Sequence, residues 1–392
     1  MSPDPSILSW CEVSADALKG NIADFRDRLQ SGARLGIVVK SNAYGHGLID
    51  SASVLQAAGA DWLIVNSVRE AQTLRQAAIE GPVYLCGPMS AAQAPLVAAS
   101  QTRVVLYDRE MLEALAQAGR ETGWAVPVHL KLETGTHRQG LELPALLDLA
   151  RQAHALEGIT VEGLTTHYAD IEDTTDHPFA MRQSEQLAEA HRALRQNGIH
   201  ISIVHSANSA ATMLWPDTHA DLVRVGIAAY GLWPSRETYA TALQRSADLG
   251  DGYRLPILSP ALSWRTRVMQ VKSVPAGAYV SYGRTFRTTY PMRLAVLPVG
   301  YYEGYGRALS NASHVLIHGV RAPVRGRVCM NMTMVDVTHI PDVDIGDVAT
   351  LLGADGEERI SAEQLAEWMG TINYEMVSTI HPDQPRLMVE HR

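Results

Sequence analysis

The stretch LGIVVKSNAYGHG, residues 35–47, carries the pattern from which the fold can be inferred. It begins with a short apolar run that ends at Val39, as expected for a buried strand of a parallel sheet. Lys40 follows at the carboxyl end of this strand, and the glycine-containing segment Tyr44–Gly47 then opens the next helical pattern. The stretch therefore predicts one strand–helix unit with a lysine at the end of its strand.

The position of Lys40 has two interpretations. A lysine at a strand end, close to a helix N-terminus that can hold an anion, suits covalent attachment of an aldehyde cofactor that bears a phosphate. On spacing alone, a solvated lysine that ends a strand explains the residue more readily, because surface lysines are common. Further motifs have to decide between the two.

Seven more apolar runs of the same kind follow in the first two-thirds of the chain. Each is short, rich in Val, Ile and Leu, and separated from the next by a helical pattern. The runs cover residues 62–65, 83–86, 104–107, 126–132, 161–166, 201–204 and 222–225. Eight such strand–helix pairs predict an α/β fold with an N-terminal (β/α)8 TIM-like barrel, in which the carboxyl ends of the strands form the active-site rim. An open, doubly wound sheet stays possible, because the number of strands does not prove closure.

The pattern changes after about residue 230. Residues 235–260 mix polar residues, Gly and Pro and are expected to connect two domains. Short β-like runs then dominate, among them LSWRTRVMQV at 262–271, with one helix expected over Ser361–Met369. We therefore predict a barrel over residues 8–245, whose first few residues join the second domain, and a mainly β C-terminal domain over 246–392.

Composition narrows the class of protein. The 392 residues carry a formal net charge of −9, which excludes a typical nucleic-acid surface because phosphate binding needs concentrated positive charge. No polybasic run suggests a membrane surface, and no apolar stretch approaches the roughly 20 residues of a membrane helix. The three cysteines, Cys11, Cys86 and Cys329, have no metal-ligand spacing and fit a reducing compartment. We expect a cytoplasmic protein without a metal, a signal peptide, a nucleic-acid partner or a membrane partner.

The segment VVKSNAYGHG at 38–47 resembles the cofactor-attachment motif of alanine racemases, which carry pyridoxal 5'-phosphate on a β/α barrel followed by a β domain. Further segments resemble this family in the family's order and span most of the chain. They are THYAD at 166–170, HSANSAA at 205–211, RVGIAAYG at 224–231, VSYGRTF at 280–286, LPVGYYEGY at 297–305, GRVCMNMTMVDVT at 326–338 and TINYE at 371–375. One such motif would be weak evidence, whereas eight in order favour an amino-acid racemase.

The resemblance implies four catalytic residues. Lys40 would hold the cofactor and act as one acid/base group, and Tyr282 would act on the opposite face of the substrate. A tyrosine needs help to act as a base near neutral pH, and the resemblance assigns that help to His167, backed by Arg224. Arg224 would also donate to the pyridine nitrogen of the cofactor and oppose its protonation.

The remaining contacts are likewise implied by the resemblance. Besides Lys40 and Arg224, the cofactor-binding residues would be Tyr44, Asn208, Ser209, Gly226, Ile227 and Tyr374. Arg138, Met330 and Tyr301 would bind the substrate, and Lys131 would be the lysine that is carbamylated in many relatives. The family also implies a homodimer in which Tyr282, Tyr301 and Met330 come from the partner subunit, and a role in making D-alanine for the cell wall.

One segment departs from the family pattern. HLKLETGTHRQG at 129–140 keeps Lys131 and Arg138 but has Glu133, Thr136 and Gln139 where the family usually has Asp, Met and Leu. These polar replacements leave a serine-tolerant or broad-specificity racemase open beside alanine.

Two further functions stay open but are less favoured. A barrel-type decarboxylase would profit from a protonated pyridine ring, which Arg224 opposes. A non-catalytic cofactor-binding regulator would be favoured if one of the two bases were missing, whereas Lys40 and Tyr282 are both present.

Overall fold

The computed structural model describes residues 4–390, and the chain divides into two compact units. The barrel unit comprises Ala17–Ala43 and Leu48–Ser259. The β unit comprises Met1–Asp16, Tyr44–Gly47 and Pro260–Arg392. The division falls between Ser259 and Pro260, whereas the sequence prediction placed it between residues 245 and 246.

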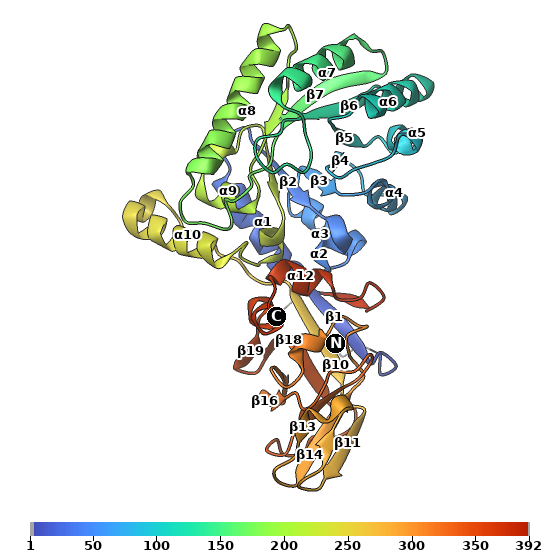
Figure 1. Cartoon of the computed structure of the whole chain (residues 1–392), viewed down its shortest axis with the longest axis vertical. Helices are drawn as coiled ribbons and strands as arrows, with labels where there is room; N and C mark the ends of the chain where they lie inside the picture. The colour runs from blue at the N-terminus through green and yellow to red at the C-terminus, as the bar shows by residue number, and fades with distance from the viewer. Residues whose placement is uncertain (1–3, 391–392) are drawn as a thin grey trace. The chain divides into compact units, whose positions relative to one another are not determined.

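Eight parallel strands form the barrel, in the order β8-β7-β6-β5-β4-β3-β2-β9 (Figure 1). They are β2 (Arg34–Val38), β3 (Trp62–Val65), β4 (Val83–Leu85), β5 (Arg103–Leu106), β6 (Val126–Lys131), β7 (Ile159–Thr165), β8 (Ile203–His205) and β9 (Leu222–Val225). Each strand coincides with one of the predicted apolar runs, and most of their residues are buried because both faces of a parallel sheet are covered. The prediction of a (β/α)8 barrel is confirmed.

The edge strands β8 and β9 close the barrel without a regular ladder. The amide of Asp221 donates to the carbonyl of Val204 at 3.1 Å, and the amide of Arg224 donates to the carbonyl of Ala207 at 2.9 Å. The side chain of Asp221 also accepts a hydrogen bond from the Val204 amide at 2.8 Å. The sheet is therefore a nearly closed barrel, and the alternative of an open sheet is wrong.

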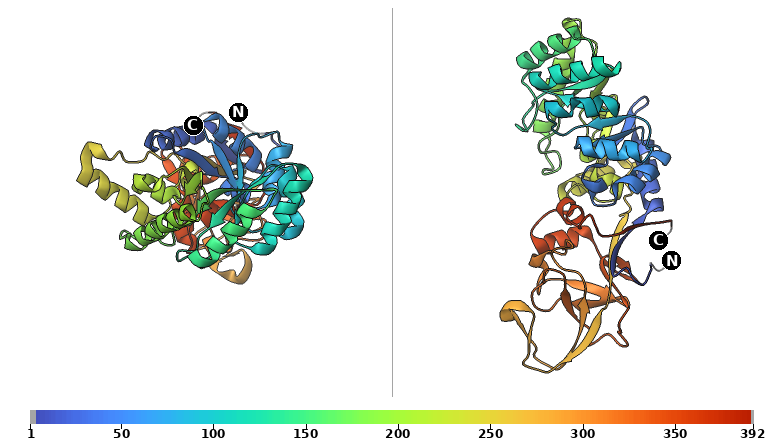
Figure 2. Two further views of the ribbon diagram at one scale, coloured as in Figure 1. Left: turned by 90° about the horizontal axis from the view of Figure 1, so that it is seen from above. Right: turned by 90° about the vertical axis from the view of Figure 1, so that its right-hand side faces the viewer.

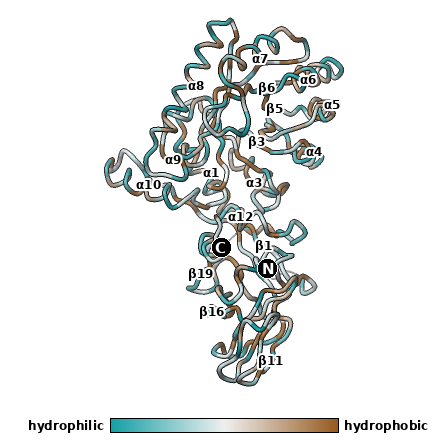
Figure 3. Tube along the Cα trace, viewed as in Figure 1, coloured by the Kyte–Doolittle hydropathy of each residue, from teal (hydrophilic) through white to brown (hydrophobic). Residues whose placement is uncertain are grey.

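Helices surround the barrel strands, as the view from above shows (Figure 2, left). They are α1 (Ala15–Arg28), α3 (Leu48–Ala57), α4 (Val68–Gln76), α5 (Ala94–Ala99), α6 (Arg109–Thr122), α7 (Leu143–Ala155), α8 (Pro178–Gln196), α9 (Ser209–Leu214) and α10 (Arg236–Leu249). Brown and teal stretches alternate along these helices in Figure 3, as expected when one face is buried. Helix α6 is typical: the carboxylate of Asp108 accepts from the Met111 amide at 2.9 Å at its start, and Gly123 ends it with a left-handed φ of 68°.

Helix α10 differs from the sequence prediction. Residues 235–260 were expected to form a connection, but the hydroxyl of Ser235 accepts a hydrogen bond from the Thr238 amide at 2.9 Å and begins a helix. Only a narrow stripe of this helix is buried, at Thr238, Thr241 and Ala242. A helix with so few buried positions lacks the apolar period that sequence analysis detects.

The β unit contains a mixed sheet in the order β16-β15-β18-β10-β1-β20, a three-stranded sheet β11-β14-β17 and a hairpin β12-β13. Its strands are β1 (Ser9–Ser14), β10 (Leu262–Arg267), β11 (Gln270–Val274), β12 (Tyr279–Val280), β13 (Phe286–Arg287), β14 (Met292–Leu297), β15 (His314–Ile317), β16 (Val320–Pro323), β17 (Thr333–Asp336), β18 (Val348–Asp355), β19 (Glu358–Ile360) and β20 (Arg386–Val389). Strand β19 pairs with β18. The prediction of a mainly β second domain is confirmed.

Two details of the β unit were not visible in the pattern. The run at 262–271 is divided between β10 and β11, which belong to different sheets, because the buried Val268 donates its amide to the carbonyl of Asp347 at 2.8 Å. A helix over Ser361–Met369 was expected and is found as α11 (Ala362–Met369), which begins after its N-cap Ser361, whereas helix α12 (Asn373–Ser378) was not expected. Among residues 4–390, no helix is long and apolar enough to cross a membrane.

Candidate active site

Lys40 follows β2 and precedes an unusual backbone turn. Ser41, Asn42, Ala43 and Tyr44 have φ values of 56°, 56°, 53° and 52°, so four successive non-glycine residues are left-handed. Such a conformation costs about 1–2 kcal/mol per residue and must be held by its surroundings. The Ser41 amide donates to the carboxylate of Glu70 at 2.7 Å, and the Asn42 side chain accepts from the Leu48 amide at 2.9 Å. Strain retained directly beside Lys40 indicates a functional constraint on this segment.

Four cations gather at the carboxyl ends of the barrel strands. Lys40 follows β2, Lys131 ends β6, Arg138 lies in the following loop and Arg224 lies in β9. All four act on His167, just after β7: burial first, and then these positive charges, hold the pKa of His167 well below its usual value. Within residues 4–390 none of the four forms an ion pair with a carboxylate. Lys131 and Arg224 are buried, Lys40 is half-buried and Arg138 is exposed. Basic side chains gathered at one place without carboxylate partners suit an anionic ligand.

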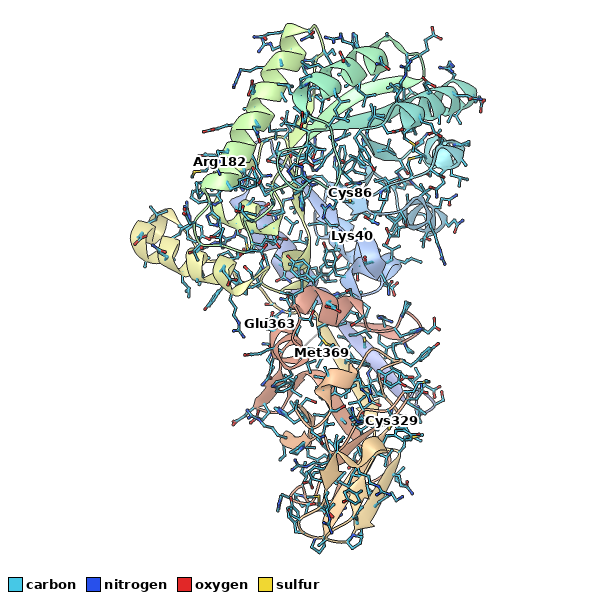
Figure 4. The ribbon with its side chains drawn as sticks, viewed as in Figure 1. Lys40, Cys86, Arg182, Cys329, Glu363 and Met369 are labelled. Carbon is cyan, nitrogen blue, oxygen red and sulfur yellow. The ribbon has the colours of Figure 1, made fainter. Side chains whose placement is uncertain are left out.

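Cys86 lies beside the same group, and Figure 4 shows Lys40 and Cys86 on the barrel unit, after β2 and β4. Burial raises the pKa of the Cys86 thiol, while the charges of Lys40 and Arg224 oppose that rise. Cys86 is therefore uncharged and does not neutralise the cations. Among the described residues, no group of three His, Cys, Asp or Glu side chains could hold a metal ion.

Arg224 is held by a dense set of acceptors. One terminal nitrogen, Nη1, donates to Nδ1 of His205 at 2.6 Å and to the Thr165 hydroxyl at 3.3 Å. The other, Nη2, donates to the carbonyls of Thr166 at 2.9 Å and Ser206 at 3.1 Å, and to Nδ1 of His167 at 3.4 Å. These bonds fix the plane of the guanidinium before any ligand binds, which is the condition for a preorganised contact.

Lys131 is 7% exposed. Burial, followed by the charges of Arg224 and Arg138, lowers the pKa of its amine to about 7. A large fraction of Lys131 is therefore uncharged near neutral pH, in contrast to an exposed lysine.

A second group of predicted residues meets where α9 and the end of β9 come together. The buried hydroxyl of Ser209 accepts a hydrogen bond from the Gly226 amide at 2.9 Å, and Ile227 begins the next short helix, η3 (Ile227–Tyr230). Asn208 caps α9 by accepting from the Ala211 amide at 3.0 Å. A hydroxyl and backbone amides in this arrangement are suitable donors for a phosphate.

The aromatic pair Tyr44 and Tyr374 lies within the β unit, with ring centroids 6.1 Å apart. Gly45 explains why this short segment belongs to that unit. Its φ is +83°, and a Cβ atom at this position would lie 2.0 Å from the carbonyl oxygen of Val377. The carbonyl of Gly45 also accepts from Nε of Arg386 at 3.0 Å. The tight backbone contact therefore fixes the Tyr44 segment next to α12, which carries Tyr374.

Tyr282, Tyr301 and Met330 are brought together by loops of the β unit. The Tyr301 amide donates to the carbonyl of Cys329 at 3.0 Å, an approach that needs Gly300, since a Cβ there would lie 2.2 Å from the same oxygen. Ser281, next to Tyr282, donates its hydroxyl to the carbonyl of Arg327 at 2.6 Å. The three predicted side chains thus share one rigid loop cluster, although they are far apart in the sequence.

This loop cluster is exposed. Tyr282 is 74% exposed, and Met330 and Tyr301 are 54% and 42% exposed. Tyr302 and Met332, from the same loops, are 55% and 54% exposed. So much apolar surface on one rigid cluster is typical of a protein–protein contact.

The loop that departs from the family pattern is closed on itself. The carboxylate of Glu133 accepts from the Gly135 amide and from the Thr136 hydroxyl, the latter at 3.5 Å. Burial opposes ionisation of Glu133, but the backbone amides of this loop lower its pKa. Gln139 donates its amide to the Tyr107 hydroxyl at 3.3 Å. The polar replacements therefore bond mainly to their own loop and to its neighbour.

Sequence reasoning missed several residues that support the site. His205 and Thr165 hold Arg224, and Glu70 holds the turn after Lys40. His205 and Thr165 end β8 and β7, so their place at the carboxyl ends of parallel strands was the available signal. Nothing in the local pattern pointed to Glu70, whose role depends on a contact with a segment 29 residues away.

Comparison with known families agrees with this geometry. The profile of the alanine racemase N-terminal domain matches residues 13–234, and that of the alanine racemase C-terminal domain matches residues 261–388. The two matched regions correspond to the barrel unit and the β unit, apart from the N-terminal strand and the region around α10.

Similar proteins match nearly the whole chain. An alanine racemase of Symbiobacterium thermophilum is 41% identical over 379 residues, which are 96% of each chain. An alanine racemase of Leptospira interrogans is 37% identical over 387 residues, covering 97% of this chain and 96% of that protein. The crystal structure of alanine racemase from Bacillus anthracis with bound L-Ala-P is 30% identical, has a TM-score of 0.89 and covers 98% and 96% of the two chains. The chain therefore belongs to the alanine racemase family of isomerases.

Proposed function

We propose that this chain interconverts L- and D-alanine, with pyridoxal 5'-phosphate bound on Lys40 and with Lys40 and Tyr282 as the two acid/base groups. The observation that carries the proposal is the group of four basic side chains at the barrel rim, of which Lys131 and Arg224 are buried, and which lacks carboxylate partners within residues 4–390. Such a group can bind both a phosphorylated cofactor and the carboxylate of an amino acid.

The donor set fits this cofactor. Lys40 supplies the amine for its attachment, and the Ser209 hydroxyl with the Gly226 and Ile227 amides would hold its phosphate, together with Tyr44 and Tyr374. Asn208 supports the same corner through its cap of α9. When bound, pyridoxal phosphate supplies an aldehyde for the amino group and a ring that withdraws electrons from the α-carbon.

Arg224 would donate to the ring nitrogen of the cofactor. Its guanidinium can only donate hydrogen bonds, so a nitrogen that faces it must accept and stays unprotonated. The fixed bonds to His205, Thr165 and the neighbouring carbonyls prevent the arginine from turning away. This contact would weaken electron withdrawal by the ring and limit side reactions of the substrate carbanion.

Racemisation needs one group to remove the α-proton from one face and another to return a proton to the opposite face. Lys40 would serve one face from the barrel unit. Tyr282 would serve the other, assisted by His167, which is uncharged because its pKa is well below its usual value through burial and the neighbouring cations. The exposed loop cluster of Tyr282, Tyr301 and Met330 suggests that a second copy of the chain supplies these residues, in a homodimer.

Arg138 would bind the substrate carboxylate, and a carbamate on Lys131 would orient Arg138. The pKa of about 7 leaves the Lys131 amine partly uncharged, as attack on carbon dioxide requires. The same cations that lower this pKa would stabilise the negative carbamate. We further propose a cytoplasmic enzyme, in keeping with its three free cysteines, that makes D-alanine for the cell wall.

A second candidate substrate is serine. The Glu133–Thr136 hydrogen bond lies in the loop that carries Arg138, so that polar groups border the proposed substrate position. Membership of the alanine racemase family disfavours a decarboxylase.

Chiral chromatography tests both substrates. L-alanine and L-serine are incubated separately with the purified protein and pyridoxal phosphate, and the enantiomers are quantified over time. We expect alanine to reach an equal mixture quickly and serine to react slowly. Comparable rates would support a broad-specificity racemase, and no reaction of either amino acid, with cofactor bound, would contradict the proposed function.

A further inference from the structure

A chain of hydrogen bonds runs through the interior of the barrel below the proposed site. Nη1 of Arg224 donates to Nδ1 of His205 at 2.6 Å, and Nε2 of His205 lies 2.7 Å from Nδ1 of His129. Nε2 of His129 lies 3.0 Å from Oε2 of Glu162, which also accepts from Nε of Arg103 at 2.9 Å. Arg103 is the first residue of β5, so these five residues connect the carboxyl and amino ends of the barrel.

Only one order of protons satisfies every member of this chain. Arg224 can only donate, so Nδ1 of His205 must accept. A neutral imidazole has a single N–H group, so Nε2 of His205 donates to His129, whose Nε2–H then donates to Glu162. Both rings are neutral, because burial lowers the pKa of His129 and, with the charge of Arg224, holds the pKa of His205 well below its usual value.

The carboxylate at the end of the chain is ionised. Burial opposes its ionisation, but the hydrogen bond from His129 and the charge of Arg103 hold the pKa of Glu162 below its usual value. An ionised carboxylate can only accept hydrogen bonds. Glu162 and Arg224 are thus a pure acceptor and a pure donor at the two ends of the histidine pair.

The packing around the histidines disfavours any other proton order. His129 and His205 are fully buried, and the Tyr84 ring lies 4.7 Å and 5.3 Å from their ring centroids. Gly163, the neighbour of Glu162, makes space for His129, because a Cβ at that position would lie 2.2 Å from Nδ1 of this ring. In so tight a setting, a reversed ring would leave a buried donor facing another donor.

We propose that Glu162 is a positioning residue of the active site: it accepts from His129, completes the proton order that Arg224 begins, and so helps to hold His205 as the acceptor that fixes the Arg224 guanidinium toward the cofactor. The last link, from Arg224 to the ring nitrogen of the cofactor, rests on the proposed function. The hydrogen bonds from Glu162 through His129 and His205 to Arg224 lie within the barrel unit and can be measured separately.

Nitrogen-15 NMR of the holoenzyme, labelled at histidine, reads the tautomers directly. The signals of His129 and His205 are assigned with His129→Gln and His205→Gln variants. We expect both rings to be neutral, with bare Nδ1 and protonated Nε2. A proton on Nδ1 of His205, or a doubly protonated ring, would overturn the proposal whether or not the enzyme racemises alanine.

Two substitutions of Glu162 separate its acceptor from its charge. Glu162→Leu leaves the buried Nε2–H of His129 without an acceptor, so the nitrogen-15 signals of His129 and His205 should shift, the absorbance spectrum of the bound cofactor should shift, and cofactor affinity should fall by up to about tenfold. Glu162→Gln keeps an acceptor oxygen and should retain the tautomers and a near-native spectrum. Native histidine nitrogen-15 signals and a native cofactor spectrum in Glu162→Leu would contradict the proposal.

The Glu12–Arg265 pair of the β unit provides a matched control. Its N–O distance is 2.9 Å, and the side-chain exposures of 20% and 19% resemble the 23% and 17% of the Arg103–Glu162 pair. Glu12→Leu should lower stability but leave the tautomers and the cofactor spectrum unchanged, and an equal spectral shift in this variant would reduce Glu162 to a structural role. If Glu162→Leu does not fold, the proposal is tested by the tautomers of His129 and His205 in the unsubstituted holoenzyme, which must be those given above. If the histidines have the expected tautomers but the enzyme does not racemise alanine, the proposed function is contradicted, whereas the role of Glu162 in the hydrogen-bond chain is not.

Discussion

The amine of Lys131 is partly uncharged near neutral pH, because burial and the nearby arginines lower its pKa to about 7. Such a shift changes the chemistry of one side chain: an amine that is normally a cation becomes a nucleophile near neutral pH. His167 and His205 stay neutral for the same reasons. The pKa values of Lys131, His167 and His205 are therefore lower than those of the free side chains mainly because these residues are buried beside Arg224.

Carbamylation of Lys131 should follow this shift. Because the pKa in the folded protein is lower than usual, the uncharged fraction rises as the pH rises through about 7 and is lost below it. With carbon-13 bicarbonate, the protein should therefore show a carbamate NMR signal at pH 8 that fades toward about pH 6. The exposed Lys272 provides the control: Lys131→Ala should remove the signal and Lys272→Ala should not.

Tyr282→Phe should abolish one of the two proton transfers. We expect racemisation to fall by about 10²–10⁴-fold. Exchange of the α-proton with solvent deuterium should persist for the enantiomer that Lys40 serves and be lost for the other. Tyr279→Phe, at another exposed tyrosine of the same unit, should change neither. Equal, mild losses of exchange for both enantiomers would make Tyr282 a packing residue.

At the scale of elements, strands β6 and β7 must approach closely enough for His129 to lie over Gly163. The pairing of these strands shifts register between Val128 and His129, at the point where the ring needs space. A glycine at this position therefore links the packing of two strands to the orientation of a buried histidine.

Gly163→Ala should destabilise the protein by about 1–3 kcal/mol, because the added methyl group would overlap the imidazole and the core would have to shift. Urea unfolding measures this change. Gly20→Ala is the matched control, since a Cβ there meets nothing within 4 Å and the residue lies in helix α1. We expect this control to stabilise the protein by roughly 0.5–1 kcal/mol, and a similar response of both variants would contradict the steric explanation.

At the scale of the whole molecule, the proposed acid/base residues belong to different units: Lys40 lies in the barrel unit and Tyr282 in the β unit. The loop cluster of Tyr282 exposes apolar side chains, among them Met330 and Tyr302. These features favour an assembly in which each site takes residues from two copies of the chain.

Mixing two inactive variants tests this assembly. Lys40→Ala and Tyr282→Phe chains are dissociated, combined in equal amounts and allowed to reassemble. If Tyr282 acts across the dimer, each mixed dimer has one intact site, and activity should recover to about a quarter of the native value, because about half of the dimers are mixed. Sedimentation analysis confirms that dimers have formed. Reassembled dimers without any recovery would show that both bases come from the same chain.

Much of the architecture could be predicted because it depends on local patterns. Short apolar runs identified all eight barrel strands, since a strand buried on both faces needs apolar residues throughout. Helix α10 could not be predicted, because its narrow buried stripe, at Ala242 and its neighbours, leaves little apolar period. The division of residues 262–271 into two strands was also hidden, because it depends on the contact of Val268 with Asp347.

The sequence by itself determined the order of the eight barrel strands, the family and the residue types of the site, because these depend on periodicity and on contiguous motifs. Only the tertiary structure decided that the turn after Lys40 is left-handed, that Lys131 is buried among cations, and that Glu162 connects to Arg224 through two histidines. Each of these depends on groups distant in sequence that meet where water is excluded. Hydrogen bonds and charges gain their strength there, and a local pattern carries no record of them.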